Sequence, residues 1–210
     1  MNEYFGNIEL GKKSDKYNFK LGDFSPKETF IEKKEAVQSA IRIGKPMFNI
    51  NHPDYCKTKV LNTLLGGYFG SRLMTNIRED KGYTYGIGSY FNASQDFGTF
   101  GISTEVGKDV TKEAIIEINK EIDIIKTELV SEEELSKVKN YMLGSLLEGT
   151  DGVFDMMDRF RAVHFNNLPN NYYLKYIKEI KETTPEELLT LANKHFNNLT
   201  TVVVGSTKVF

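Results

Sequence analysis

The spacing of apolar residues changes along the chain, and each change predicts a different element. A loose apolar–polar alternation over residues 35–43 predicts a strand. From Tyr55 the apolar residues take helical spacing, which Gly66-Gly67 ends. The same spacing over 71–80 predicts a second, short helix. Residues 35–80 are therefore predicted to form a strand followed by two helices.

The spacing then falls to two residues over 83–91 and 97–106, which is typical of strands. Turn residues at 92–96 separate the two segments, so they predict a β-hairpin. One face of its first strand is expected to carry Tyr83, Tyr85, Ile87, Ser89 and Phe91.

The remainder of the chain is predicted to be mostly helical. An apolar stripe predicts a long helix over 110–129, and a capping sequence at 131–134 opens the next helix. Shorter periodic runs predict helices at 152–165 and 170–181, and a second capping sequence begins a helix over 184–196. A buried strand is expected at 202–205. Strands grouped apart from helices predict an α+β domain, with a mostly antiparallel sheet and helices packed on one face.

The lysine-rich segment 1–34 shows no clear period, and we interpret it as a linker and the tail of a preceding unit. The predicted domain is therefore 35–210.

Composition narrows the class of protein. The chain has 210 residues, of which 40% are hydrophobic and 27% charged, as expected for one globular domain. A net charge of -2 gives no basic footprint for nucleic acid. No apolar run is long enough to cross a bilayer, and residues 1–6 lack the features of a signal peptide. We expect a soluble chain that contacts neither nucleic acid nor membrane, in a compartment that the sequence leaves open.

The residues that bind metals or act as nucleophiles are few and scattered. A catalytic zinc needs about three protein ligands, often two histidines four residues apart on one helix. The three histidines are His52, His164 and His195, and the nearest two are 31 residues apart. We interpret them as structural or surface residues, and the single cysteine, Cys56, as a packed thiol.

Glycine is concentrated in one region, because nine of the 17 glycines lie between positions 66 and 107. Neither a phosphate-binding loop nor a dinucleotide fingerprint fits their context. Gly86, Gly88, Gly101 and Ser103 would leave one face of the hairpin nearly bare. Such a face packs tightly against a helix or receives an extended peptide, and the sequence leaves both interpretations open.

Arg78 closes the second predicted helix, and Tyr85 opens the hairpin seven residues later, with Gly82 between them. A guanidinium and a phenol hydroxyl brought together in this way can donate hydrogen bonds to a peptide carbonyl and stabilise an oxyanion. Tyr83 competes for the same role, because it lies on the same predicted strand face.

The segment from Leu64 to Tyr85 resembles the second half of the pitrilysin/insulinase-type zinc metallopeptidases, which include mitochondrial processing peptidase. The shared pattern is a Leu-Gly-Gly stop, a Ser-Arg-Leu helix and Arg-Glu-x-x-Gly-x-x-Tyr, which here runs from Arg78 to Tyr85 and selects Tyr85 over Tyr83. The resemblance extends from the strand near residue 35 to the strand at 202–205. Tyr4-Phe5-Gly6 is similar to the sequence that closes the preceding half.

This resemblance implies one of two homologous α+β halves that close around a peptide. The first half of such proteins carries zinc through His-x-x-Glu-His, which this sequence lacks, and the second supplies an Arg/Tyr pair. We therefore expect a carboxy-terminal, metal-free half that is inactive alone and uses Arg78 and Tyr85 to bind substrate. No cofactor is expected in this chain, and zinc is expected in the partner half. The expected partners are a peptide substrate and a homologous zinc-bearing half, in the same parent chain or a separate subunit.

Two alternatives stay open. The first is a non-catalytic substrate-recognition or structural subunit of the same family. The second is an unrelated α+β binding module.

Overall fold

The computed structural model describes residues 2–8, 11 and 22–210. A five-stranded sheet forms one layer, with the strand order β1-β5-β2-β4-β3. Its strands are β1 (Glu28–Glu32), β2 (Gln38–Met47), β3 (Ile87–Ala93), β4 (Gly98–Gly107) and β5 (Thr200–Gly205). Only the β1–β5 pair is parallel, and the β3–β4 hairpin has the predicted antiparallel pairing.

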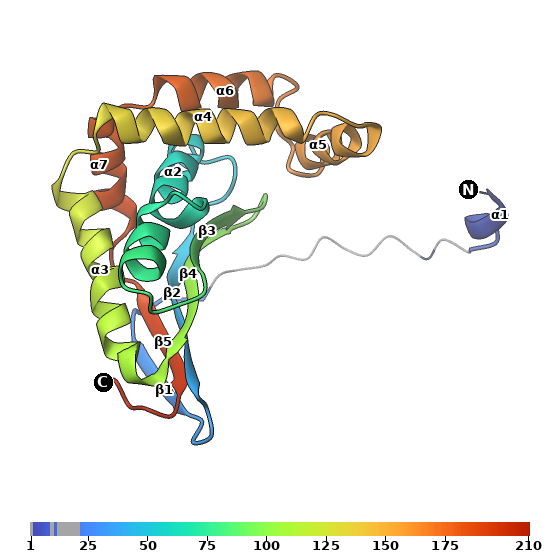
Figure 1. The fold of residues 1–210 in the computed structure, drawn as a ribbon. Coiled ribbons are helices and arrows are strands. Elements are labelled where there is room, and N and C mark those ends of the chain that lie inside the picture. Colours follow the sequence, from blue (N-terminus) through green and yellow to red (C-terminus); the bar gives the residue numbers. More distant parts are fainter. Residues whose placement is uncertain (1, 9–10, 12–21) are drawn as a thin grey trace.

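A layer of helices covers one face of the sheet. The α-helices of the described residues are α1 (Asn2–Phe5), α2 (Tyr55–Asn62), α3 (Thr111–Thr127), α4 (Glu132–Glu148), α5 (Val153–Phe165), α6 (Tyr172–Glu182) and α7 (Pro185–His195). Two π-helices, η1 (Thr63–Gly67) and η2 (Met74–Asp80), and a 3₁₀ turn, η3 (Lys108–Val110), complete the set. Figure 1 shows α2, α3 and α7 on one side of the sheet, while α4 and α6 lie across its upper end. This arrangement confirms the predicted α+β class.

The core lies between the sheet and the helices. Alternate strand residues face it and are fully buried, as at Ile41, Ile43, Phe91, Phe100, Ile102 and Val203. The helices contribute Leu61, Leu64, Ile118 and Leu188. Burying one such side chain stabilises the fold by roughly 1.5–3 kcal/mol, so this cluster fixes the sheet against the helical layer.

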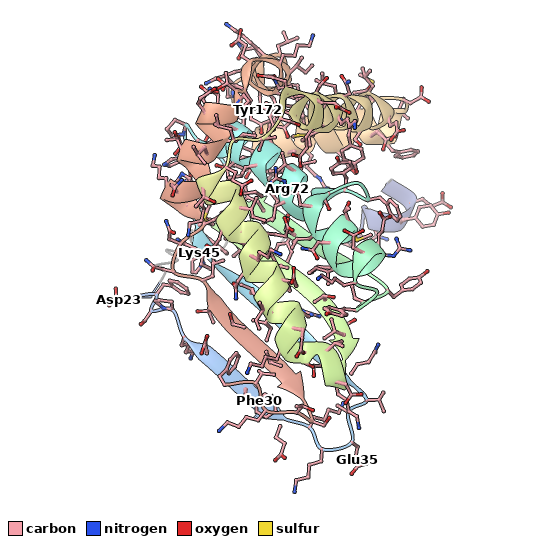
Figure 2. The ribbon with its side chains drawn as sticks, turned by 60° about the vertical axis from the view of Figure 1, so that its left-hand side comes forward. Asp23, Phe30, Glu35, Lys45, Arg72 and Tyr172 are labelled. Atoms are coloured by element: carbon pink, nitrogen blue, oxygen red, sulfur yellow. The ribbon has the colours of Figure 1, made fainter. Side chains whose placement is uncertain are left out.

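The predicted linker is wrong over residues 28–32, which form the edge strand β1. Its partner is β5, and the Lys33 N–H continues the pairing by donating to the Gly205 carbonyl at 2.7 Å. Figure 2 shows Phe30 of β1 beside β5 at the margin of the sheet. A five-residue strand with glutamates at both ends shows little apolar–polar alternation. Its partner β5 lies about 170 residues away in the sequence, so a local pattern does not reveal the pairing. Residues 1, 9–10 and 12–21 of the same predicted segment lie outside the described residues.

Two smaller predictions also need correction. β3 begins at Ile87, so Tyr83 and Tyr85 precede the strand. Leu129, the last residue of the predicted stripe at 110–129, follows α3 and is exposed, whereas Ala114, Ile118 and Ile125 are buried as expected.

Candidate functional site

Arg78 lies on the π-helix η2, where each backbone hydrogen bond joins residues five apart instead of the four of an α-helix. The Lys81 N–H donates to the Asn76 carbonyl, five residues back, at 3.0 Å. Gly82 then takes a φ of 65°, which reverses the chain towards β3 and which glycine adopts without steric cost. π-helical turns are often found at functional sites. Here the turn and the glycine together bring the chain back past Arg78.

The Thr84 hydroxyl holds the loop on both sides of Tyr85. It donates to the Glu105 carbonyl of β4 at 2.7 Å and accepts from the Gly86 N–H at 3.1 Å. The Thr104 hydroxyl donates to the Thr84 hydroxyl oxygen at 3.0 Å. Because these bonds tie the backbone before and after Tyr85 to β4, the start of that side chain is fixed relative to the sheet.

The Arg78 guanidinium lies over two aromatic rings. Its carbon is 4.8 Å from the Phe69 ring centroid and 5.6 Å from that of Tyr85. Tyr85 is 93% exposed and Phe69 61% exposed, so this contact lies at the surface. A cation–π contact at an exposed site is worth about 0.5–1 kcal/mol, which orients the guanidinium more than it stabilises the fold. We call Phe69, Arg78 and Tyr85 the Arg78 cluster.

The structure brings the two candidate residues together and separates Tyr83 from them. Tyr83 is half-buried against the hydrophobic core. Phe69 is the member that sequence reasoning missed. Its aromatic ring inside the Leu64–Tyr85 motif was the available signal, but no periodicity separates an exposed ring from a packed one.

No residue in the described part of the chain pairs with the polar groups of the Arg78 cluster. Among the residues that the structure describes, no carboxylate lies within 4.0 Å of Arg78, and neither Arg78 nor the Tyr85 hydroxyl has a side-chain hydrogen bond. A guanidinium carries five N–H donors and a phenol one O–H donor. The cluster can therefore donate hydrogen bonds to a carbonyl oxygen and stabilise negative charge that develops on it.

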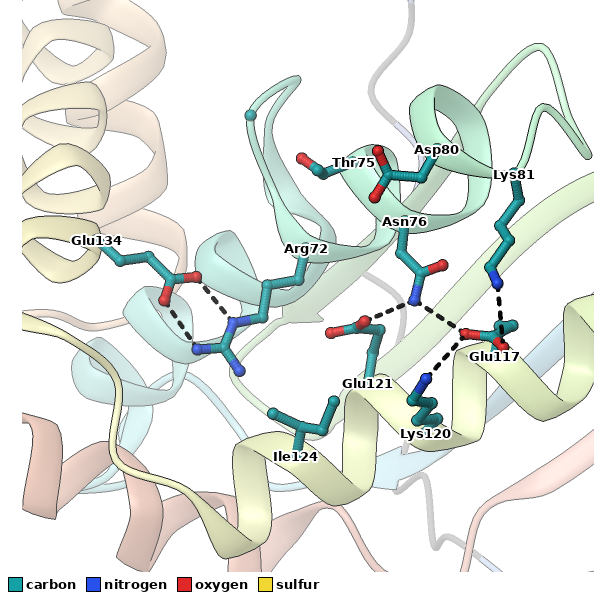
Figure 3. A pocket seen from close by; sticks show the side chains of 11 residues that line it. Arg72, Thr75, Asn76, Asp80, Lys81, Glu117, Lys120, Glu121, Ile124 and Glu134 are labelled. Carbon is teal, nitrogen blue, oxygen red and sulfur yellow. Dashed lines mark hydrogen bonds and ion pairs between the residues drawn. The ribbon is translucent and has the colours of Figure 1, made fainter.

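On the side of η2 that faces α3 and α4, charged residues line a groove of about 560 Å³ (Figure 3). Arg72 donates two bonds of 2.8 Å to Glu134, and this bidentate pair raises the pKa of Arg72. Asn76 donates to Glu121 at 2.6 Å and to Glu117 at 3.2 Å. The hydrogen bond from Asn76 lowers the pKa of Glu117, as do nearby lysines. These contacts hold η2 in place and so support Arg78.

Glu134 also explains a capping box that is only half formed. Its N–H donates to the Ser131 hydroxyl at 3.2 Å, as predicted for the start of α4. Its carboxylate binds Arg72 instead of returning to the Ser131 N–H. The other predicted box, Thr184 with Glu187, forms both of its bonds at the start of α7.

The glycine-rich face of the hairpin fits neither interpretation as a whole. The Tyr90 ring covers Gly101 directly across the β3–β4 pair. Gly88 approaches the end of η1, where an added Cβ would lie 3.3 Å from the Gly66 carbonyl oxygen. Gly86 has open space around it. Helix packing therefore accounts for Gly88 alone.

The histidines do not gather into a metal site. His195 ends α7 and lies 2.7 Å from the Asp54 carboxylate, and burial lowers its pKa despite that neighbour. His52 stacks on Phe48 and His164 on Phe160. Within residues 2–8, 11 and 22–210, no three His, Cys, Asp or Glu side chains are placed to hold a metal ion. The donor set of this part of the chain does not fit zinc.

Cys56 packs against the core, as expected. Burial raises the pKa of its thiol to about 11, so the group is protonated at neutral pH and is a poor nucleophile. In the part of the chain that the structure describes, no helix has the length and apolar character that a membrane crossing requires.

Comparison with known proteins gives a consistent result. The family described as "Peptidase M16 inactive domain" matches residues 1–142. An "Uncharacterized zinc protease" of Rickettsia felis is 28% identical over 206 residues, which cover 95% of this chain and 48% of the relative. The "Non-peptidase homolog YmxG" of Helicobacter pylori is 25% identical over 99% of this chain and 48% of its own length.

A solved structure shows the same fold. The peptidase M16 inactive domain from Pseudomonas fluorescens aligns with a TM-score of 0.81 and 27% identity, over 88% of this chain and 44% of that one. The chain spans about half the length of the curated relatives just described. Together with the resemblance in the Leu64–Tyr85 segment, these matches show that the chain belongs to the peptidase M16 family, as an inactive domain of that family.

Proposed function

We propose that this chain is the carboxy-terminal half of a zinc-dependent metalloendopeptidase, which binds and positions a peptide opposite a zinc-bearing half and is inactive alone. The observation that carries the proposal is the Arg78 cluster, where a guanidinium lies over the exposed Tyr85 ring without a carboxylate partner among the described residues. Family membership and the missing His-x-x-Glu-His motif support it.

In this proposal the two side chains have distinct roles. Arg78 donates hydrogen bonds to a backbone carbonyl of the peptide and holds the strand in register. The Tyr85 hydroxyl donates to the scissile carbonyl oxygen, where negative charge grows as the bond is attacked. The Phe69 ring is the second ring that the Arg78 guanidinium contacts, and it helps to hold that group in place. Zinc, when bound in the partner half, supplies Lewis-acid chemistry, and no residue of this chain is assigned to hold it.

The second candidate is a non-catalytic substrate-recognition or structural subunit. A relative that matches 99% of this chain is named a non-peptidase homolog, which favours keeping this alternative. The same cluster would then hold a peptide carbonyl without cleavage. A His-x-x-Glu-His motif in the other half of the parent protein, or in its partner subunit, separates the two functions.

The proposal is tested first on the chain alone. With added zinc, the purified chain should not cleave unstructured peptides, whereas chelator-sensitive cleavage free of contaminating protease would refute it. Fluorescence anisotropy with a labelled unstructured peptide should show binding that Arg78→Gln weakens. Lys45→Gln is the matched control, because it also removes one positive charge. That charge belongs to β2, where the Lys45 ammonium group donates a hydrogen bond to the Asn197 carbonyl. Equal affinity of wild type and Arg78→Gln would remove Arg78 from the site.

A further inference from the structure

A pocket of about 250 Å³ opens where four helices meet, away from the Arg78 cluster. Its lining includes Lys59 of α2, Tyr141 and Ser145 of α4, Arg159 of α5 and Tyr176 of α6. Helices α2, α4 and α6 contact one another, and Figure 1 shows α5 at the far end of α4. We call this feature the Lys59 pocket. Because its residues come from widely separated segments, no spacing in the sequence reveals it.

The Lys59 side chain is a half-buried ammonium group without a counter-ion. It donates one hydrogen bond, of 3.0 Å, to the Phe91 carbonyl of β3. Burial lowers the pKa of Lys59, and no carboxylate among the described residues is close enough to raise it. Lys57, two residues earlier on α2, instead pairs with Glu187 and Glu179. An ammonium group has three N–H donors, so two of those on Lys59 remain for a ligand.

Arg159 brings a second positive charge that is held in place. Its guanidinium donates to the Leu146 and Gly149 carbonyls at the end of α4 and lies 5.0 Å from the Tyr173 ring centroid. A Cβ added to Gly149 would lie 2.6 Å from Nη2 of Arg159, so the glycine makes room for the guanidinium. These bonds use two of the five N–H donors of the group. In the part of the chain that the structure describes, no carboxylate lies within 4.0 Å of Lys59 or Arg159.

The other lining groups are hydroxyls or apolar side chains. Tyr141 and Ser145 lie one turn apart on the same face of α4, and each carries one O–H donor. Neither hydroxyl has a hydrogen-bond partner among the described residues. Met142 and Leu146 add apolar contacts. Since none of the described residues that line the pocket is Asp or Glu, its charge is positive and suits an anion.

The groove beside η2 shows the usual arrangement of such cations. There Arg72 pairs with Glu134, and Lys81 and Lys120 both pair with Glu117 (Figure 3). Cations that are partly removed from water are usually paired in this way, because the loss of hydration is costly. The Lys59 pocket has the cations without the carboxylates, so we expect a ligand to supply the missing partner.

The surroundings of the pocket favour a carboxylate over a phosphate group. Phosphate sites commonly use a helix N-terminus, whereas the residues of α2, α4, α5 and α6 that line this pocket lie beyond the first turn of each helix. The C-terminus of α4, which carries about half a negative charge, lies against Arg159. Two cations beside that partial charge balance one negative charge more closely than two.

We propose that the Lys59 pocket binds the carboxylate group of a small acid or of a peptide C-terminus, with Lys59 and Arg159 as its charged donors. The Tyr141 and Ser145 hydroxyls complete the donor set, and Met142 contacts the carbon atoms next to the carboxylate. The pocket is smaller than the roughly 300–1,000 Å³ of sites that enclose a whole ligand, so it receives one end of a molecule. This site does not involve the Arg78 cluster and is independent of the function proposed for it.

Two-dimensional NMR of the isotope-labelled chain, titrated with sodium propionate at constant ionic strength, tests the proposal. Backbone amide signals around Lys59 and Ser145 should shift and saturate with a dissociation constant on the order of 1 mM, since the anion stays partly hydrated in an open pocket. Propionamide, which has the same shape without the charge, should leave these signals in place.

An acetylated tripeptide with a free carboxyl terminus distinguishes the two sources of the carboxylate. Tighter binding of this tripeptide than of propionate would support the proposal with a peptide C-terminus as the ligand. Equal or weaker binding would support it with a small acid as the ligand. The same tripeptide with an amidated terminus should not bind, because the charged group is lost.

Variants test the assigned donors. Lys59→Met keeps much of the side-chain length and removes the charge, so it should weaken propionate binding at least about tenfold. Lys45→Met is the matched control, because Lys45 is also a lysine whose pKa is lowered by burial and which donates to a backbone carbonyl, but it does not line the pocket. Ser145→Glu, at an exposed position of α4, places a carboxylate beside the two cations and should also weaken binding at least about tenfold. Circular dichroism checks that each variant stays folded.

Three results would overturn the proposal. The first is the absence of a saturable shift with propionate or with the tripeptide acid. The second is binding that both folded variants, Lys59→Met and Ser145→Glu, leave unchanged. The third is tighter binding of inorganic phosphate than of propionate, which would assign the pocket to a phosphate group.

Discussion

The two sides of η2 differ sharply, although they belong to the same seven-residue helix. On the side facing α3 and α4, Asn76 and the neighbouring Arg72 bond to glutamates at close range. On the other side, Arg78 contacts two aromatic rings, and within residues 2–8, 11 and 22–210 no carboxylate pairs with it. Paired charges fix a structure but are not free to bind a ligand, whereas an unpaired guanidinium on a fixed support is. We infer that the paired side positions η2 and the unpaired side meets the substrate.

The largest expected contrast lies between adjacent residues. Ile77 is fully buried, so Ile77→Ala should lower the free energy of unfolding by about 2–5 kcal/mol. Arg78→Ala should lower it by no more than about 1 kcal/mol, because the half-buried side chain makes only cation–π contacts with exposed rings. Urea denaturation followed by circular dichroism measures both. A large loss in Arg78→Ala would mean that the arginine is structural.

A smaller effect is expected on the paired side. Arg72→Met keeps much of the side-chain volume but removes the bidentate bond to Glu134, which should cost about 1–2 kcal/mol. Peptide affinity should change far less than in Arg78→Gln. If Arg72→Met abolished peptide binding while the domain stayed folded, the division between the two sides would be wrong.

The smallest effect depends on pH. The pKa of Glu117 is lowered in the folded chain by the Asn76 hydrogen bond and by nearby lysines. A carboxyl with a lowered pKa stabilises the fold above its unfolded value, about 4.3, and loses that contribution as pH falls through the folded value. The stability difference between wild type and Glu117→Gln should therefore be present at pH 6 and shrink towards pH 3. A difference that does not change with pH would show that Glu117 acts by shape alone.

Local pattern predicted much of the fold. The β3–β4 hairpin and the helices α3 to α7 were predicted because their periodicity lies within short windows. β1 was missed because its partner β5 is distant in sequence, and the π-helical geometry of η2 has no recognised pattern. α5 was predicted as a helix, but its spacing alone does not show that the apolar side faces outward.

The candidate site depended on more than spacing. Spacing left Tyr83 and Tyr85 equivalent, and the family resemblance selected Tyr85. The structure adds the physical difference, since Tyr83 packs on the core and Tyr85 is exposed beside Arg78. Phe69 is identified as part of the candidate site only by its contact with the Arg78 guanidinium in the structure.

The central claim is that the Tyr85 hydroxyl acts on the substrate and not on the fold. Its most direct test is the turnover of Tyr85→Phe in an active complex with the zinc-bearing half, with Tyr90→Phe as the matched control. The account predicts that Tyr85→Phe lowers turnover about tenfold or more at unchanged stability, while Tyr90→Phe does not. Equal turnover of Tyr85→Phe and wild type would contradict it.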